Sequence, residues 1–296
     1  MKKHLIKMTL LALAGMAFTS MPAKALTYSD GDLLLGFRAT GGSSVTTDYV
    51  IDLGVFTQFT AGGVYVTGSP VNISIGGITN GSGVAADLSA QYGSDWYTNT
   101  TTGLLWGVAG TQKSIGNGTS TANTLFVSAA EPSNGTQSTP WNRASTLSQG
   151  GPAGKMTTGT GQGGVYATGS ATANDTAGTF QSTSTTNSWA YQMPGGGGTT
   201  ATSAYSTYSG TGGAGLEAVV SNTSANVLDL YRLNTGSGPG SLLGTLTLGS
   251  NGTVAFDAVP EPSTYAMLVG GVLALVVLRR NMPGKNTRKK LTDSSC

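Results

Sequence analysis

The chain has 296 residues and a formal net charge of +2, and only 9% of its residues are charged. Most basic residues lie near the two ends, so residues 26–258 hold five basic residues against eleven acidic ones, a net charge of −6. This acidic part has no basic patch, which argues against a nucleic-acid partner. The single His is His4 and the single Cys is Cys296. Residues 26–258 therefore cannot form a Ser-His-Asp triad, a cysteine nucleophile, a disulfide or a usual zinc site.

Residues 1–25 follow the three-part order of a secretory signal peptide. The positive n-region contains three lysines: Lys2, Lys3 and Lys7. Residues 8–18 form a short apolar h-region, which we expect to be helical, and Ala23 and Ala25 give the small-x-small pattern of a cleavage site. We expect export by the Sec machinery and cleavage by signal peptidase after Ala25, so that the mature chain begins at Leu26.

The first part of the body, residues 26–130, is rich in strand pattern. Short apolar or alternating segments bounded by turn residues predict six strands, at 33–39, 45–53, 64–66, 71–75, 103–109 and 124–129. The Gly-Gly-Ser-Ser segment 41–44 predicts a hairpin turn between the first two strands. Residues 85–92 are the best helix candidate, because Leu88 and Tyr92 are four residues apart.

Residues 131–215 have a different composition, in which Gly, Ser, Thr, Asn and Ala dominate. Such a segment buries too little apolar surface to offset the entropy of ordering it, unless it lies on a neighbour. We expect long loops and a few short strands that lie over a single domain. Scattered aromatic side chains could dock this segment: Trp141, Trp189, Tyr191, Tyr205 and Tyr208.

Residues 216–258 return to a strand pattern, with strands predicted at 227–233, 242–248 and 253–256. A Gly-rich turn joins the first two strands, and the Asn-Gly pair at 251–252 predicts a tight hairpin between the last two. Together the elements predict an all-β body, mainly β with one or two short helices. We expect an antiparallel sandwich or a partly open barrel with long Gly/Ser/Thr-rich loops.

The apolar segment 265–278 corresponds to about 21 Å of helix at about 1.5 Å per residue. A bilayer core is about 30 Å thick and usually needs about 20 residues. Because long Arg side chains can snorkel to the interface, a short span is tolerable. We expect a transmembrane helix over 263–278 in contact with membrane lipid, with Arg279 and Arg280 as the stop-transfer signal. The basic tail 281–296 then stays in the cytoplasm and the body lies outside.

The tail also carries a short sequence motif. Val259-Pro260-Glu261-Pro262, followed by an apolar stretch and an Arg pair, resembles the PEP-CTERM sorting signal, a tail also called the ice-binding protein C-terminal domain. In that family an exosortase, a membrane cysteine protease of Gram-negative bacteria that make exopolysaccharide, recognises the tail and cuts near the Pro-Glu-Pro. The resemblance covers residues 259–280 and implies that Pro260, Glu261 and Pro262 form the processing motif. It implies a chain anchored in the inner membrane with its body in the periplasm, and then delivered to the cell surface or released.

We predict no catalytic residue, metal ligand or cofactor in the body. We expect a non-catalytic structural or interaction role at the cell surface or in the extracellular matrix, in association with exopolysaccharide. The alternative is a carbohydrate-active enzyme, or a carbohydrate- or calcium-binding module, that uses Asp or Glu and surface aromatic residues. An enzyme of this kind requires two carboxylates that converge in a cleft, one of them with a raised pKa.

Four groups of residues bear on these alternatives. Asp30 and Asp32 can offer oxygen ligands to calcium, or they can form an ordinary turn. Asp48 and Asp52 would lie on one face of a strand about 13 Å apart, which exceeds the separation of about 5–9.5 Å between paired glycosidase acids. The motif 159–164 matches the letters of a dinucleotide fingerprint, but no strand and helix surround it. Three aromatic residues either form a sugar-stacking platform or, more often, belong to the core: Trp96, Tyr97 and Trp106.

Overall fold

The chain separates into two compact units, Met1–Val259 and Pro260–Cys296. The computed structural model describes residues 24–25, 28–60, 62–66, 69–73, 82–98, 102–114, 121–157, 168–169, 178–184, 188–193, 205, 215–221, 226–259, 273, 275 and 279.

The body is built on one antiparallel sheet with the strand order β4-β12-β11-β10-β6-β5-β2-β3-β8, and β9 pairs with β5 beside this path. In chain order its strands are β2 (Asp32–Ala39), β3 (Thr47–Val55), β4 (Val71–Asn72), β5 (Leu104–Gln112), β6 (Thr124–Ala130), β8 (Gly178–Ser182), β9 (Ala218–Val219), β10 (Val227–Leu233), β11 (Ser241–Leu248) and β12 (Val254–Ala258). A separate small sheet pairs β1 (Lys24–Ala25) with β7 (Thr168–Gly169).

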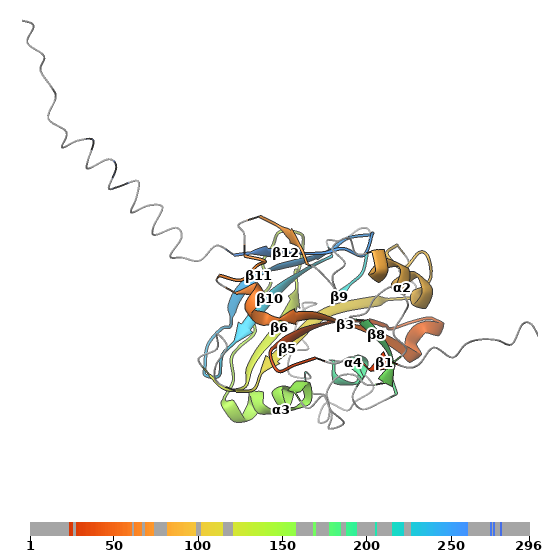
Figure 1. Cartoon of the computed structure of the whole chain (residues 1–296), viewed down its shortest axis with the longest axis horizontal. Helices are drawn as coiled ribbons and strands as arrows, with labels where there is room; N and C mark the ends of the chain where they lie inside the picture. Colours follow the sequence, from red (N-terminus) through yellow and green to blue (C-terminus); the bar gives the residue numbers. More distant parts are fainter. Residues whose placement is uncertain are drawn as a thin grey trace, which may run out of the picture. The chain divides into compact units, whose positions relative to one another are not determined.

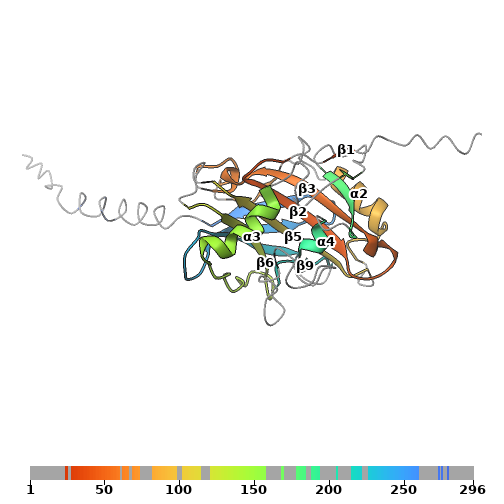
Figure 2. The same ribbon diagram turned by 90° about the horizontal axis from the view of Figure 1, so that it is seen from below.

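Short helices lie between the strands along the chain. They are η1 (Ser43–Thr46), η2 (Phe56–Phe59), α2 (Ser82–Tyr92), α3 (Thr146–Thr157) and α4 (Trp189–Gln192). Figure 1 shows the sheet curled into a half-barrel, with α3 and α4 along its lower side. Figure 2, seen from below, shows these two helices lying in front of the strands, so both cover the same face of the sheet.

The curl follows from aromatic packing on the concave side of the sheet, called here the inner face. Phe59 follows β3, and its ring lies 5.1 Å from that of Phe256 on β12, although five strands separate β3 from β12 in the sheet order. Phe56 stacks on Phe126 of β6 with ring centroids 4.4 Å apart. The inner face therefore closes on a buried aromatic core, which α2 covers with Val84, Leu88 and Tyr92.

Strands in the middle of the sheet are buried on both faces. In β2 alternate residues such as Leu33, Leu35 and Phe37 belong to the inner core, whereas Leu34 belongs to a second cluster on the opposite, outer face. That second cluster also contains Val50, together with Trp189 from α4 and other residues of the low-complexity region. The outer face is therefore covered in part by residues of segment 131–215, whose composition alone predicts loops.

The prediction of a mainly β, antiparallel body with a partly open barrel is confirmed by the described residues. The sandwich alternative is wrong, because these strands form one curled sheet and not two packed layers. Most predicted strands lie within one to three residues of the observed ones. Residues 64–66, predicted as a strand, lie in a turn region, and the strand predicted at 71–75 is described only as Val71–Asn72. The predicted signal helix lies outside the described residues.

Helix α3 is an unexpected element, since residues 131–215 were predicted to hold loops and short strands. With α2 and α4 it brings the described α-helices to three, more than the one or two predicted. The Ser145 hydroxyl accepts a hydrogen bond from the Ser148 N–H at the start of α3, as an N-cap does. The Gln149 side chain is buried and donates to the carbonyl of Leu233, 2.7 Å away. This tertiary contact stabilises a helix that contains Pro152, a residue unfavourable in helix interiors.

Candidate functional site

The sorting segment begins where the sheet ends. Strand β12 pairs with β11 through Ala258, and the next residue, Val259, donates its N–H to the carbonyl of Leu243 at 3.0 Å. Val259 is 40% exposed. No spacer therefore separates the last hydrogen bond of the sheet from Pro260 in the sequence.

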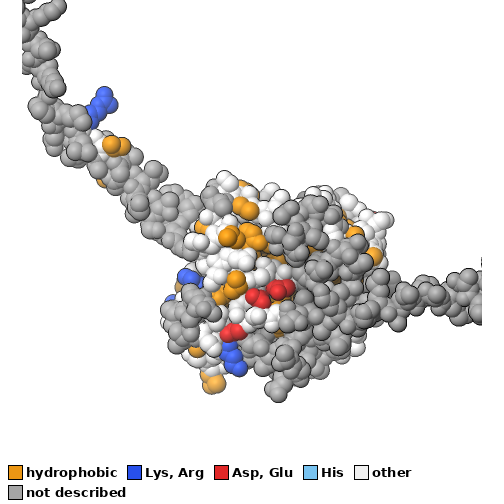
Figure 3. Space-filling model, in the orientation of Figure 1, with side chains coloured by type: hydrophobic (Ala, Val, Ile, Leu, Met, Phe, Trp, Pro, Cys, Tyr) orange, Lys and Arg blue, Asp and Glu red, His pale blue; other side chains and the backbone are white. Residues whose placement is uncertain are grey.

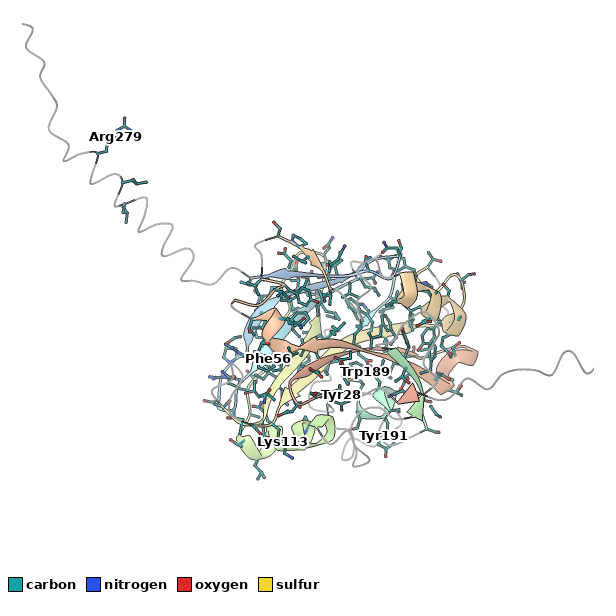
Figure 4. All side chains as sticks on the ribbon, in the orientation of Figure 1. Tyr28, Phe56, Lys113, Trp189, Tyr191 and Arg279 are labelled. Carbon is teal, nitrogen blue, oxygen red and sulfur yellow. The ribbon has the colours of Figure 1, made fainter. Side chains whose placement is uncertain are left out.

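The predicted processing residues Pro260, Glu261 and Pro262 lie outside the described residues, as do Arg280 and Ala23. In the tail only three residues are described, all helical and exposed: Leu273, Leu275 and Arg279, of which Figure 4 labels Arg279. Ala25 belongs to β1. In the parts of the chain that the structure describes, no helix is long and apolar enough to cross a membrane. The predicted span 263–278 lies almost entirely outside those parts and stays a prediction.

A buried ion pair holds the outer face of the body. Arg38 of β2 contacts Glu217, which precedes β9, through a 2.6 Å salt bridge, and the two side chains are only 9% and 5% exposed. The Arg38 Nε also donates to both Glu217 oxygens at 2.9 Å. Charge-assisted bonds of this two-pronged kind are among the stronger ones in proteins. The two residues are 179 positions apart, so this bond ties the first described strand of the large sheet to the segment that follows the low-complexity region.

Trp189 completes this cluster from α4. Its indole N–H donates to Glu217 at 2.9 Å, and its ring lies directly on the backbone of Gly36, where an added Cβ would come within 2.0 Å of the ring. Figure 4 shows Trp189, the first residue of α4, beneath the strands. Gly36 is therefore required for the close approach of the indole to the sheet.

Asp48 lies beside Arg38 on β3 and is fully buried. Its Oδ2 accepts a hydrogen bond from the Ala190 N–H of α4 at 2.7 Å. Burial raises the pKa of Asp48 to about 7, against the opposing effect of the Ala190 N–H, and the negative charge of Glu217 adds to the rise. This carboxyl group joins α4 to the sheet and is inaccessible to solvent, so Asp48 has a structural role.

A second polar group lies at the other end of the outer face. Glu131, after β6, and Asp229, on β10, line a pocket of about 290 Å³ together with Asn134, Gln137 and Thr245. Burial and the charge of Asp229 raise the pKa of Glu131, although the Gly135 N–H opposes the rise. Two carboxylates thus converge on one pocket, a juxtaposition that depends on cross-strand register and not on spacing along the chain.

Asp30 and Asp32, considered from the sequence as possible calcium ligands, both form hydrogen bonds within the protein. Both oxygens of Asp30 accept hydrogen bonds, from the Gln112 side chain and the Lys113 N–H, while Asp32 accepts from the Ser29 N–H. The Asp32 bond is local, as in a turn, whereas the Asp30 bonds tie this segment to residues 82 and 83 positions away at the end of β5. No group of three or more His, Cys, Asp or Glu side chains suited to a metal occurs among the described residues.

Asp48 and Asp52 do point to one face of β3, as predicted, since the register between β2 and β3 is unbroken between them. The two side chains form separate hydrogen bonds, and Asp52 accepts from the Gly54 N–H. Burial raises the pKa of Asp52 to about 6. Trp96 and Trp106 are 3% and 0% exposed and belong to the inner core, so the sugar-stacking platform is wrong and the core interpretation holds. The motif 159–164 lies outside the described residues.

Comparison with known proteins identifies the tail. Residues 258–281 match the family described as the PEP-CTERM protein-sorting motif. The chain therefore carries this sorting motif, as its sequence predicted. Neither the curated proteins nor the solved structures contain a match to the chain, so no relative assigns a role to the body.

Proposed function

We propose that the chain is exported by the Sec machinery, held in the inner membrane by residues 263–278, and delivered to the cell surface or the extracellular matrix. An exosortase-type protease acts on the tail near Pro260-Glu261-Pro262. The observation that carries this proposal is the sorting motif at 258–281. The signal-peptide pattern at 1–25 supports it, because the body must leave the cytoplasm before the tail is processed.

The junction between body and tail fits such processing. Every strand of the large sheet precedes Val259. A cut near the Pro-Glu-Pro would leave all pairs of β12 with β11 and β4 intact. The released body would then keep its sheet and both hydrophobic clusters, which is what a delivered surface protein requires.

For the body we propose a non-catalytic structural or interaction role, in contact with exopolysaccharide. Figure 3 shows that charged side chains on the visible face are few and lie among uncharged ones. Arg38 and Glu217 are engaged in a buried pair, and Asp48 is sealed under α4. These charged groups stabilise the fold and do not face a substrate.

The carbohydrate-active alternative meets one of its requirements at Glu131 and Asp229, which line a common pocket. It misses others. Asp229 is 1% exposed, and its Oδ2 already accepts hydrogen bonds from the Ser138 N–H and hydroxyl, so this oxygen is not available as a base. The described residues lining the pocket include no aromatic side chain on which a sugar ring could stack. The pocket therefore favours binding over hydrolysis.

Deletion of residues 265–280 tests the anchoring step. We expect the deleted chain to appear in the periplasm in soluble form, while the unaltered chain sediments with membranes in cells that lack the exosortase. As a control, Arg279→Lys and Arg280→Lys keep the positive charge and should keep the membrane association. A deleted chain that still sediments with membranes would show that the span is assigned to the wrong segment.

A further inference from the structure

The pocket beside Glu131 is formed by the register of three strands. Asp229 on β10 lies directly opposite Ala129 of β6 on one side and Thr245 of β11 on the other. Two residues after Ala129, the Glu131 N–H donates to the carbonyl of Val227 at 3.4 Å. Glu131 and Asp229 are therefore diagonal cross-strand neighbours, whose side chains can reach one another.

Asp229 is buried with half of its hydrogen-bonding capacity unused. The residue is 1% exposed, and its Oδ2 accepts from the Ser138 N–H at 2.5 Å and from the Ser138 hydroxyl at 2.7 Å. Its Oδ1 is buried and accepts no hydrogen bond from the described residues. A buried carboxylate oxygen without a partner is unfavourable, and in a native structure it calls for an ion or a water.

No protein cation compensates the two carboxylates. Within the described parts of the chain the only ion pair joins Arg38 to Glu217. The Glu131 Oε2 accepts a hydrogen bond from the Gly135 N–H at 2.7 Å, and this donor is neutral. Two adjacent carboxylates of a net acidic body thus share a pocket without a Lys or Arg partner, and like charges so placed repel unless a cation joins them.

We propose that this pocket binds a divalent cation of the calcium type. Glu131 and Asp229 would supply carboxylate oxygens, and the other polar side chains that line the pocket would supply amide and hydroxyl oxygens: Asn134, Gln137, Thr245 and Thr247. Calcium takes six to eight oxygen ligands in flexible geometry, whereas Mg²⁺ demands a regular octahedron and releases its waters reluctantly. All donors here are oxygens on a loop and on strand faces, which suits calcium.

The pocket volume of about 290 Å³ exceeds what one ion needs, so it leaves room for water molecules on the cation. Only two carboxylates contribute charge, which predicts weak binding, with a Kd of about 10⁻⁴–10⁻³ M, as in extracellular calcium modules. This inference does not depend on the proposed sorting, because it concerns the folded body alone.

The test uses the full-length chain purified in a mild detergent and stripped of metal with a chelator. We expect CaCl₂ at about ten times Kd to raise Tm by about 3–6 °C, with binding measured directly by titration calorimetry. MgCl₂ should give a smaller shift, and NaCl at matched ionic strength none. Glu131→Gln and Asp229→Asn should each weaken calcium binding at least tenfold.

Asp95→Asn is the matched control, since Asp95 is an exposed carboxylate in a turn far from the pocket in sequence and is not among its lining residues. It should bind calcium like the unaltered chain. If Asp229→Asn fails to fold, Glu131→Gln at its half-buried site still decides the question. The proposal is overturned if CaCl₂ gives neither a Tm shift nor calorimetric heat up to 10 mM, or if Glu131→Gln responds to calcium as fully as the control.

Discussion

Replacement of Asp48 by Asn is the sharpest probe of how α4 is fastened to the sheet. Burial raises the pKa of Asp48 from its ordinary 3.8 to about 7. Between these values the folded chain keeps a proton that the unfolded chain has released. The free energy of unfolding therefore falls as the pH rises from about 4 to about 7, by at most about 1.4 kcal/mol per pH unit and about 4 kcal/mol in total. Asn resembles the protonated acid, so Asp48→Asn should remove this loss.

The assay is urea unfolding of the full-length chain in detergent, followed by tryptophan fluorescence between pH 4.5 and 8.5. We expect the variant to exceed the unaltered chain in stability only slightly near pH 4.5 and by most of the total at pH 8. Asp52, whose pKa is raised to about 6, adds a slope of the same sign that the variant keeps. Asp95→Asn controls for the loss of a negative charge. An unchanged pH slope in Asp48→Asn, or a less stable variant at pH 8, would refute the reasoning.

Three further substitutions probe the outer face and the calcium pocket. Gly36→Ala places a methyl group 2.0 Å from the Trp189 ring, and we expect a loss of about 1–3 kcal/mol. The measurement is urea unfolding, with Gly151→Ala as a comparison, because there the added Cβ meets no atom within 4 Å. Glu217→Gln leaves Arg38 buried without its charge partner, so stability should fall by about 3–5 kcal/mol; a loss below about 1 kcal/mol would show that water reaches the guanidinium. Glu131→Gln without calcium should leave stability unchanged or higher, because one of two adjacent carboxylates is neutralised; a clear loss of Tm would contradict this.

The strands were predictable because each buries at least one face in a regular alternation. Residues 33–39 and 227–233 show an apolar pattern that packing preserves, and the structure places β2 and β10 there with shifts of at most one residue. The single curled sheet was less predictable than its strands. It depends on contacts such as Phe59 with Phe256, and strand patterns are the same in a sandwich and in an open barrel.

The helices over the outer face could not be predicted from local pattern. The segment of α3 contains Gly150, Gly151 and Pro152, which argue against a helix, and the Gln149 bond to Leu233 that stabilises it spans 84 positions. In α4 a four-residue helix is held by the Ser188 cap and by the burial of Trp189. Propensity is a weak guide where tertiary contacts decide.

The functional residues also differ in how well the sequence alone predicts them. The sorting motif is linear, so its residues could be recognised along the chain and the family match confirms it. The ion pair of Arg38 with Glu217 joins distant segments, and the approach of Glu131 to Asp229 requires the register of β6 on β10. One signal was present: each of these residues is one of only sixteen charged groups between residues 26 and 258. A rare charge in an apolar strand, such as Arg38 in residues 33–39, must find a partner.

The most direct test of the account is the mass of the protein recovered from cells with and without the exosortase. With the protease, intact-mass measurement should find a species outside the inner membrane that lacks residues 1–25 and ends near Pro260-Glu261-Pro262. Without the protease, it should find a membrane-bound species that lacks only residues 1–25. A chain that keeps its tail and stays in the membrane in both strains would contradict processing at the sorting motif.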